Sequence, residues 1–503
     1  YINIKNIKKI KIGILSSLIV AASLNGCKKT DLFPLNSIEQ SQAFKTVQDA
    51  KAWDGGLNNT FRFRFYGPYA TATDIQADQL NASLDFGNRN GTLHRWGPPL
   101  LADDGAFSTQ WSGYYGGLTN VNIAIAGYET IPTTTPAQVT ELNTYKGNAY
   151  FFRAHYYHKL ITRFAKPYNA ATANTDLGVP LILTFDVNAK PARATVQAIY
   201  TQILADIATA KTLLAARAGS QGANRPTIDV VTALEARVKL DMKDYAGAYA
   251  AANSLITSNR YPLYTTAAGL KSYWHNDAKQ ESIMQIFISR PNELPNTNAV
   301  YLGLIPASGK WAPDFIPSRW VVDTYADSDL RKAVYFEAKN VIMQGIDFPG
   351  TFLVNKYPGN PVYFTGANTN YVHEPKAFRI AEMYLIAAEA GATNSTNVAG
   401  ATTALNALRV ARGLLPVIAT GQALIDAVRE ERFRELAFEG FRLNDLMRYG
   451  QGFTRRDPQN INSLTTGADF SSLSIDAANN QFVWAIPTLD VTVNPNIVQN
   501  PGW

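Results

Sequence analysis

The sequence predicts a mostly α-helical fold in which helical hairpins form a scaffold, with long irregular loops and short β insertions between them. Apolar residues recur at the three- and four-residue spacing of a helix face over several segments. Stretches rich in Gly, Asn, Pro and aromatic residues separate these segments, at 66–118, 261–330 and 340–376. Loops of this length are usually functional, so we expect them to form the working face.

The hairpin pattern is clearest at 230–256, where the turn Met242-Lys243-Asp244 separates two helical segments. Small and apolar residues line both of them: Ala233, Ala236, Leu240, Ala248, Ala252 and Leu255. Such residues let two helices cross closely, as in tetratricopeptide-like repeats that bury their faces on one another. The same periodicity predicts further helices at 142–164, 196–214, 378–390, 401–412 and 422–449.

Residues 1–26 are typical of a bacterial secretion signal. Lysines form its basic start: Lys5, Lys8, Lys9 and Lys11. The apolar stretch 12–24 is too short to span a bilayer as a mature helix. Small residues then lead to Cys27, the only cysteine in the chain. This arrangement resembles the lipobox of bacterial lipoproteins, so we predict that Cys27 is lipidated and that 27–40 is a tether. The alternative is a core cysteine that follows an apolar helix.

The composition argues against nucleic acid as a partner. The formal net charge is +6, but the signal lysines supply most of it, and no basic stripe remains in the rest of the chain. Charged residues make up only 17% of the chain, while aromatic residues reach 11%. Many rings with little charge suit a protein that presents aromatic side chains to an uncharged, polar ligand such as a sugar.

Several short motifs occur along the chain. Glu281 begins an E-x-I segment, and Asp329-Leu330-Arg331 forms a D-x-R segment. Other motifs are NAYFFRAHYY at 148–157, DLGVPL at 176–181, RIAEMYLIAAEA at 379–390, LNALR at 405–409, EERFRELAFEG at 430–440 and WAIP at 484–487. In their order along the whole chain they resemble the motifs of the SusD/RagB family, the surface glycan- or peptide-binding lipoproteins of Bacteroidetes.

The resemblance implies a helical superhelix of four tetratricopeptide-like units. It divides the chain into an N-terminal part, 41–270, and a C-terminal part, 271–503, within one compact unit. It also implies a lipid-anchored protein of the outer membrane that faces the cell surface. Its partner would be a TonB-dependent, SusC-like barrel, to which it passes oligosaccharides without catalysis and without a cofactor. In this family such a protein sits over the barrel as a lid. The alternative is a member of the family that has the same lid role but binds peptides.

The acids at 430–439 suggest catalysis at first sight. Glu431, Glu435 and Glu439 would share a helix face with Arg432 and Arg434 at pairing distance, which predicts a structural ion-pair face. His155 and His158 lack the H-E-x-x-H pattern of a zinc helix, and we expect them to be packing or solvated residues. No nucleotide-binding loop or nucleophile elbow occurs. We expect that the protein is not an enzyme. The alternative is a lipid-anchored glycoside hydrolase with Asp103 and Asp104 as its acids.

Sugar binding needs an aromatic plane for the C–H face and polar side chains for the hydroxyls. The Gly- and Asn-rich stretch 74–96 offers both, so we predict ligand contacts from it: Asp78, Asn81, Arg89, His94 and Trp96. Alternatively, this stretch is a structural loop whose tryptophan packs against the scaffold and does not contact ligand. The other long insertions add Trp274, Trp311 and Trp320 as candidates.

Overall fold

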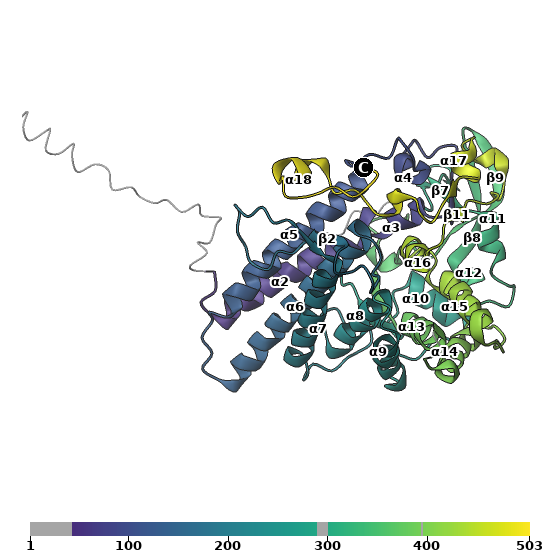
Figure 1. Cartoon of the computed structure of the whole chain (residues 1–503). Helices are drawn as coiled ribbons and strands as arrows, with labels where there is room; N and C mark the ends of the chain where they lie inside the picture. Colours follow the sequence, from purple (N-terminus) through teal and green to yellow (C-terminus); the bar gives the residue numbers. More distant parts are fainter. Residues whose placement is uncertain (1–42, 289–299, 394–395) are drawn as a thin grey trace, which may run out of the picture.

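Long helices form one side of the molecule (Figure 1). The computed structural model describes residues 43–288, 300–393 and 396–503, so the signal segment, Cys27 and the whole tether lie outside the described residues. The helices of this side are α2 (Val47–Arg62), α5 (Gly105–Tyr128), α6 (Pro136–Phe164) and α7 (Val196–Leu213). Helix α6 begins where Thr135 accepts the N–H of Gln138 and Pro136 occupies the first turn. The predicted mostly α-helical fold class is confirmed.

The hairpin predicted at 230–256 is confirmed. Helices α8 (Ile228–Asp241) and α9 (Tyr245–Thr257) are joined by the expected turn. Lys243 takes a left-handed conformation there, with φ of 60°, and Asp244 caps α9 by accepting the N–H of Gly247 at 2.9 Å. The small residues at the crossing, among them Ala236 and Ala252, are completely buried. Side chains of this size let the two helix backbones approach each other.

A second helical group lies toward the C-terminus. It consists of α13 (Ile380–Ala392), α14 (Val398–Ala411), α15 (Gly421–Leu436) and α16 (Arg442–Tyr449). Helix α13 packs on α9 as well as on α14 and α15, which joins this group to the first one. The periodic stretch 422–449 is interrupted, because Phe438 and Gly440 have φ values of 63° and 78°. Glu439 therefore lies beyond the end of α15, which corrects the prediction that it shares a helix face with Glu435.

The stretch 66–118 contains more helix than the sequence predicted. It holds α3 (Pro68–Gln76), α4 (Gly91–Arg95) and the first half of α5. Its glycines suggested a loop, but Gly117 serves helix packing instead. A Cβ at Gly117 would lie 2.5 Å from the ring of Tyr156 on α6, so only glycine lets the two helices approach here.

Most of the short strands lie on the side opposite the long helices, whereas β2 lies beside them (Figure 1). Strands β8 (Phe336–Met343) and β9 (Ile346–Val354) form an antiparallel hairpin through Gln344 and Gly345, both with positive φ, as a tight two-residue turn requires. Strand β6 (Lys310–Trp311) lies parallel to β8 and pairs with β5 (Leu304–Ile305). The remaining strands form two-stranded pairs: β1 (Leu80–Ala82) with β7 (Phe315–Pro317), β2 (Leu177–Pro180) with β3 (Arg193–Thr195), β4 (Ser282–Gln285) with β10 (Lys376–Arg379), and β11 (Phe453–Thr454) with β12 (Ser474–Ile475).

Short helices complete the described chain: α10 (Ala267–His275), α11 (Arg319–Asp323), α12 (Lys332–Tyr335), α17 (Ala468–Ser471) and α18 (Thr488–Val493).

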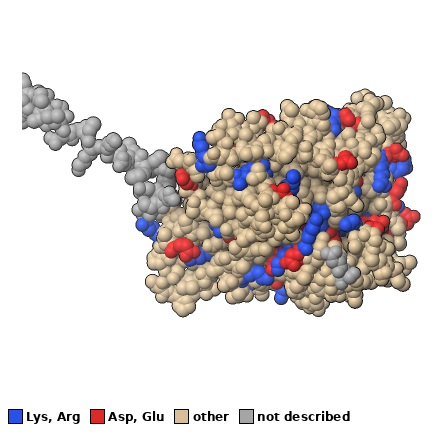
Figure 2. All heavy atoms as spheres, viewed as in Figure 1, with Lys and Arg blue, Asp and Glu red and all other residues tan. Residues whose placement is uncertain are grey.

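One large hydrophobic core links helices from both sides of residue 270, while a second core lies between α10 and the strands. The predicted boundary at 270 stays a prediction. Acidic and basic side chains lie in small scattered groups over the face seen in Figure 2, most of which other residues form. Within the described residues, no helix is both long and apolar enough to cross a membrane.

Candidate functional site

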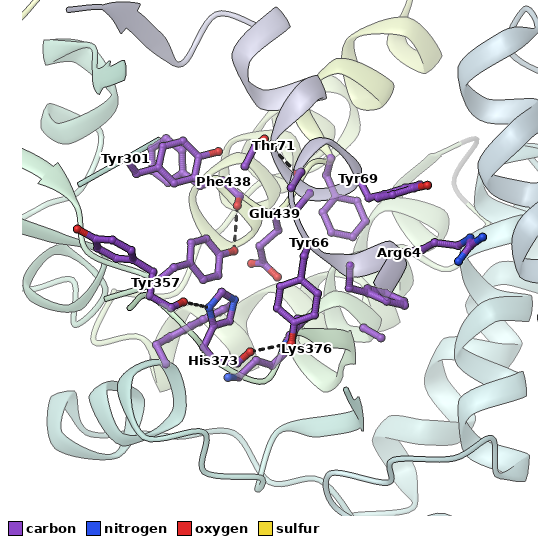
Figure 3. A pocket seen from close by; sticks show the side chains of 18 of the residues that line it. Arg64, Tyr66, Tyr69, Thr71, Tyr301, Tyr357, His373, Lys376, Phe438 and Glu439 are labelled. Atoms are coloured by element: carbon purple, nitrogen blue, oxygen red, sulfur yellow. Dashed lines mark hydrogen bonds between the residues drawn. The ribbon is translucent and has the colours of Figure 1, made fainter. Parts of the chain in front are cut away.

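A pocket opens where the long helices meet the strand-rich side. Its volume is about 140 Å³, enough for roughly ten water molecules. Aromatic side chains dominate its wall, and Figure 3 shows them around the opening: Tyr66, Tyr69, Tyr301, Tyr357 and Phe438. They come from four separate parts of the chain. A concave, aromatic surface with a few polar groups is the usual form of a small-ligand site.

The segment 64–71 supplies one wall of this pocket. The 3-10 helix η2 (Phe63–Phe65) ends just before Gly67, whose φ of 56° turns the chain into α3, and Pro68 begins that helix. Tyr66 is fixed because its hydroxyl donates to the carbonyl of His373 at 3.0 Å. Tyr69 projects from α3 and remains partly exposed.

The opposite wall is held by hydrogen bonds between loops. The hydroxyl of Tyr357 donates to the carbonyl of Phe438 at 2.9 Å, and its ring stacks on His373 with centroids 4.9 Å apart (Figure 3). Burial and the nearby Lys376 ammonium lower the pKa of His373 to about 4, so its imidazole is neutral at neutral pH. The neutral ring is a stacking surface and adds no charge to the pocket.

Trp274 lies at the base of the pocket, with 1% of its surface exposed. Three cations surround its ring. The Nζ of Lys356 lies 4.3 Å from the ring centroid, that of Lys376 5.6 Å, and the guanidinium of Arg379 5.2 Å. Glu439, also in the pocket wall, binds Lys356 at 2.6 Å and Arg379 at 2.6 Å. These contacts fix the base of the pocket.

A buried ionic network continues from Glu439 into the protein. Its centre is Glu435, which binds Arg379 at 2.8 Å, Arg412 at 2.9 Å and Arg331 at 3.0 Å. Burial alone would raise the pKa of Glu435, but Arg412 and Arg379 hold it well below its usual range. An acid so fully paired cannot exchange protons near neutral pH. The network is structural, as expected, although its arginines come mainly from other elements.

The motifs noted in the sequence meet in this network. Asp329 binds Arg331 at 2.7 Å, and Glu281 binds Arg412 at 2.8 Å. Arg432, expected to pair within its own helix, instead binds Asp445 at 2.8 Å. Arg434 does pair with Glu431 as predicted, at 2.9 Å. Motifs dispersed over a large part of the chain therefore serve one ionic cluster beneath the pocket.

Of the residues predicted to bind ligand, only Trp274 lines this pocket. Four others belong to the interior. Trp96 is 1% exposed, and its indole N–H donates to the carbonyl of Gln76 at 2.7 Å. The other three are equally engaged: Asn81 donates to the Phe470 carbonyl, His94 hydrogen-bonds the Ile75 carbonyl, and Asp78 binds Arg442 at 2.7 Å. Trp96 therefore packs against the scaffold, as the alternative interpretation of this loop expected.

The three remaining candidates reach the surface away from the pocket. Arg89 is exposed and pairs with Asp314. Trp311 lies 4.7 Å from the Nζ of Lys339, while Trp320 stacks on Phe433 with centroids 4.9 Å apart. Ligand contact by these three side chains stays a prediction.

The acids considered for hydrolysis are engaged in local structure. Asp104 caps α5 by accepting the N–H of Ala106 at 2.9 Å, and Asp103 accepts the N–H of Thr488 at 3.0 Å. His158 binds Asp241 at 2.7 Å, while His155 packs among the rings of the main core. Across the described part of the chain, no group of three or more potential ligating side chains could hold a metal ion.

Sequence reasoning missed most of the pocket. Tyr66 and Tyr69 flank a Gly67-Pro68 turn, and this aromatic-rich turn is a signal that could have found them. Tyr301, Tyr357 and His373 follow no local pattern, because each reaches the pocket only through folding.

Known proteins resemble the chain along nearly all of its length. A model of the SusD family matches residues 310–503, and a second model, described as "Starch-binding associating with outer membrane", matches residues 67–240. The SusD-like protein P38 of Formosa agariphila is 25% identical over 558 residues, covering 99% of each chain.

Solved structures resemble the fold as well. A SusD superfamily protein from Bacteroides thetaiotaomicron has a TM-score of 0.75 at 25% identity, covering 91% of this chain and all of its own. A laminarin-binding SusD-like protein has a TM-score of 0.67 at 19% identity, covering 92% of this chain and all of its own. The sequence models, the relative and the fold agree: the chain belongs to the SusD/RagB family.

Proposed function

We propose that the protein binds oligosaccharide in the aromatic pocket and passes it to a TonB-dependent outer-membrane transporter, over which it acts as a lid. The observation that carries this proposal is the ring-lined pocket. Tyrosine faces offer planes for the C–H surface of a sugar, and the tyrosine hydroxyl oxygens, although their protons are already donated to carbonyls at Tyr66, Tyr69 and Tyr357, can still accept hydrogen bonds from its hydroxyl groups. The acids at the base of the pocket, Glu435 and Glu439, are already paired with cations, which favours binding over catalysis.

The family supports carbohydrate as the ligand. One matching family model is described as starch-binding, and one similar structure is that of a laminarin-binding protein. The same description associates that family with the outer membrane. The anchor, in this proposal, is lipid on Cys27, and the transporter is the acceptor of the ligand.

A glycan and peptide array followed by calorimetry tests the binding site. Tyr69→Ala removes a partly exposed ring from the pocket wall, and we expect it to weaken binding of an array-selected glycan roughly tenfold, since a stacked ring contributes about 1 kcal/mol or more. Phe185→Ala is the matched control, because Phe185 is an exposed ring outside the pocket. Equal affinities for Tyr69→Ala and the unmodified protein would place the site elsewhere. Binding of peptides alone would contradict the carbohydrate proposal.

The transporter role has a separate test. Purification of the protein from its native membrane under mild detergent should recover a TonB-dependent barrel in stoichiometric amount. Recovery of the protein without any barrel, at detergent concentrations that preserve other outer-membrane complexes, would contradict the lid role while leaving sugar binding intact.

A further inference from the structure

We propose that the ligand carries an anionic substituent, a carboxylate or a sulfate, and that Lys159 binds this group in the pocket. The inference rests on the proposed function and adds the chemical class of the sugar. It comes from the distribution of charge around the pocket, where cations outnumber carboxylates among the described residues.

Most charged groups of the pocket already have counterions. Arg237 binds Glu382 at 2.6 Å, and Lys376 binds Asp277. Glu439, the carboxylate in the wall, is shared between two cations, as described above. These pairs neutralise one another and leave little charge for a ligand.

Lys159 is different. It projects from α6 into the pocket wall and remains partly exposed, and its side-chain amine forms no hydrogen bond or ion pair with any described residue. Arg64, in the same wall, donates only to the carbonyls of Thr60 and Gly113 within the described chain. Figure 3 shows its guanidinium directed away from the opening. Among the described residues, Lys159 is therefore the cation that faces the pocket without a counterion.

The surroundings make this amine costly to charge. Burial, together with the positive charges of Arg237 and Arg163, lowers the pKa of Lys159 to about 7, whereas Glu382 and Asp241 act in the opposite direction with smaller effects. A lysine kept only for packing needs its aliphatic stem, which methionine or leucine would supply without this cost. An anionic ligand would offset the cost directly, and a neutral sugar hydroxyl would do so far less.

Calorimetry with matched ligands tests the proposal. The array should hold acidic oligosaccharides beside uncharged counterparts: tetragalacturonate with its methyl ester, and a sulfated galactan tetrasaccharide with its desulfated form. We expect the charged member of a pair to bind more tightly, and Lys159→Met to weaken its binding roughly ten- to hundredfold, the range for a hydrogen bond to a charged group. Lys146→Met is the control, because Lys146 lies on the same helix but pairs with Glu129 at the surface.

A second measurement needs no variant. Binding of an anion should raise the pKa of Lys159, so at pH 8 the unmodified protein should take up a proton with a charged ligand and none with its neutral counterpart. Titrations in buffers of different ionisation enthalpy measure this uptake. The two ligand pairs distinguish carboxylate from sulfate.

The outcomes separate this inference from the proposed function. Equal binding of charged and neutral members, or unchanged affinity in Lys159→Met without proton uptake, would overturn the inference and leave sugar binding in place. Absence of any glycan binding would overturn both.

Discussion

Asp74 shows how much the pocket depends on single buried groups. It lies on α3, has no exposed surface, and accepts the N–H of Gly440 at 2.9 Å. Burial raises its pKa to about 7, Glu439 adds to the shift, and the Gly440 N–H and Lys356 oppose it. Asp74 thereby links the helix that carries Tyr69 to the turn that carries Phe438.

Replacing Asp74 should change how stability depends on pH. Between pH 4 and 7 the folded protein retains a proton that the unfolded chain has lost, so the stability of the unmodified protein falls as pH rises through this range. Asp74→Asn keeps an oxygen for the Gly440 N–H and removes the titration. We expect it to be more stable than the unmodified protein above pH 7, by up to about 4 kcal/mol, with the difference disappearing toward pH 4.

Thermal unfolding of both proteins at pH 4.5, 6 and 8 measures this difference. Asp103→Asn is the control, since its exposed carboxylate also accepts a backbone N–H. A destabilisation of Asp74→Asn that is the same at every pH would contradict the prediction.

Residue types in the sequence predicted that the site is aromatic, but they did not predict where in the fold the site lies. Trp96 and Trp274 are both tryptophans in aromatic insertions, and both are buried. Only Trp274 lies beneath the pocket, because the indole of Trp96 turns toward the carbonyl of Gln76. The direction of a loop side chain depends on partners far along the chain, and local pattern holds no information about them.

The helix α15 carries the acids that organise the base of the pocket. Glu435 faces inward and binds three arginines, whereas Glu430, on the same helix, has 71% of its side chain exposed. Removing the charge of Glu435 would leave those arginines buried without their shared counterion. Such a loss is costly, because a buried unpaired charge cannot be solvated.

We therefore expect Glu435→Gln to lower the free energy of unfolding by about 3–5 kcal/mol. Denaturation in guanidinium chloride measures the loss, and Glu430→Gln is the matched control, for which little change is expected. A loss below about 1 kcal/mol in Glu435→Gln would mean that the network contributes little to stability.

Helices and strands differed in how well the sequence predicted them. The hairpin of α8 and α9 was predicted almost to the residue, because helical periodicity and turn chemistry are local. Strands β5 and β6 have two residues each and exist only through pairing: β6 pairs with β8, and β5 pairs with β6. Such strands lack a periodic signal of their own. The break after Leu436 was missed for a similar reason, since Phe438 adopts its positive φ within a folded turn.

At the scale of the whole molecule, the pocket joins parts of the chain that lie far apart in sequence. Tyr66 follows the first helices, Trp274 lies in α10, and Phe438 follows α15. The helical scaffold fixes their separation, and the ionic network fixes the base between them. The scaffold was predictable from repeated helical patterns, but the pocket was not, because it exists only where the scaffold meets the insertions.

The predicted lipid anchor should be separable from this pocket. Among the described residues, those that line the pocket begin at Arg64, well after Cys27. Cys27→Ser removes the thiol that we predict to be acylated. Because no acyl chain can then attach at this position, we expect the protein to move from the membrane fraction to the soluble fraction. Its affinity for the array-selected glycan should equal that of the unmodified protein.

Labelling cells with an alkyne fatty acid measures acylation, membrane fractionation measures membrane attachment, and calorimetry measures affinity for the glycan. The unmodified protein should incorporate the label, and Cys27→Ser should not. Retention of unlabelled Cys27→Ser in carbonate-washed membranes would assign the membrane attachment to another part of the chain. Loss of glycan affinity in a folded Cys27→Ser would mean that the ligand site depends on the anchor, against the separation argued from the position of the pocket.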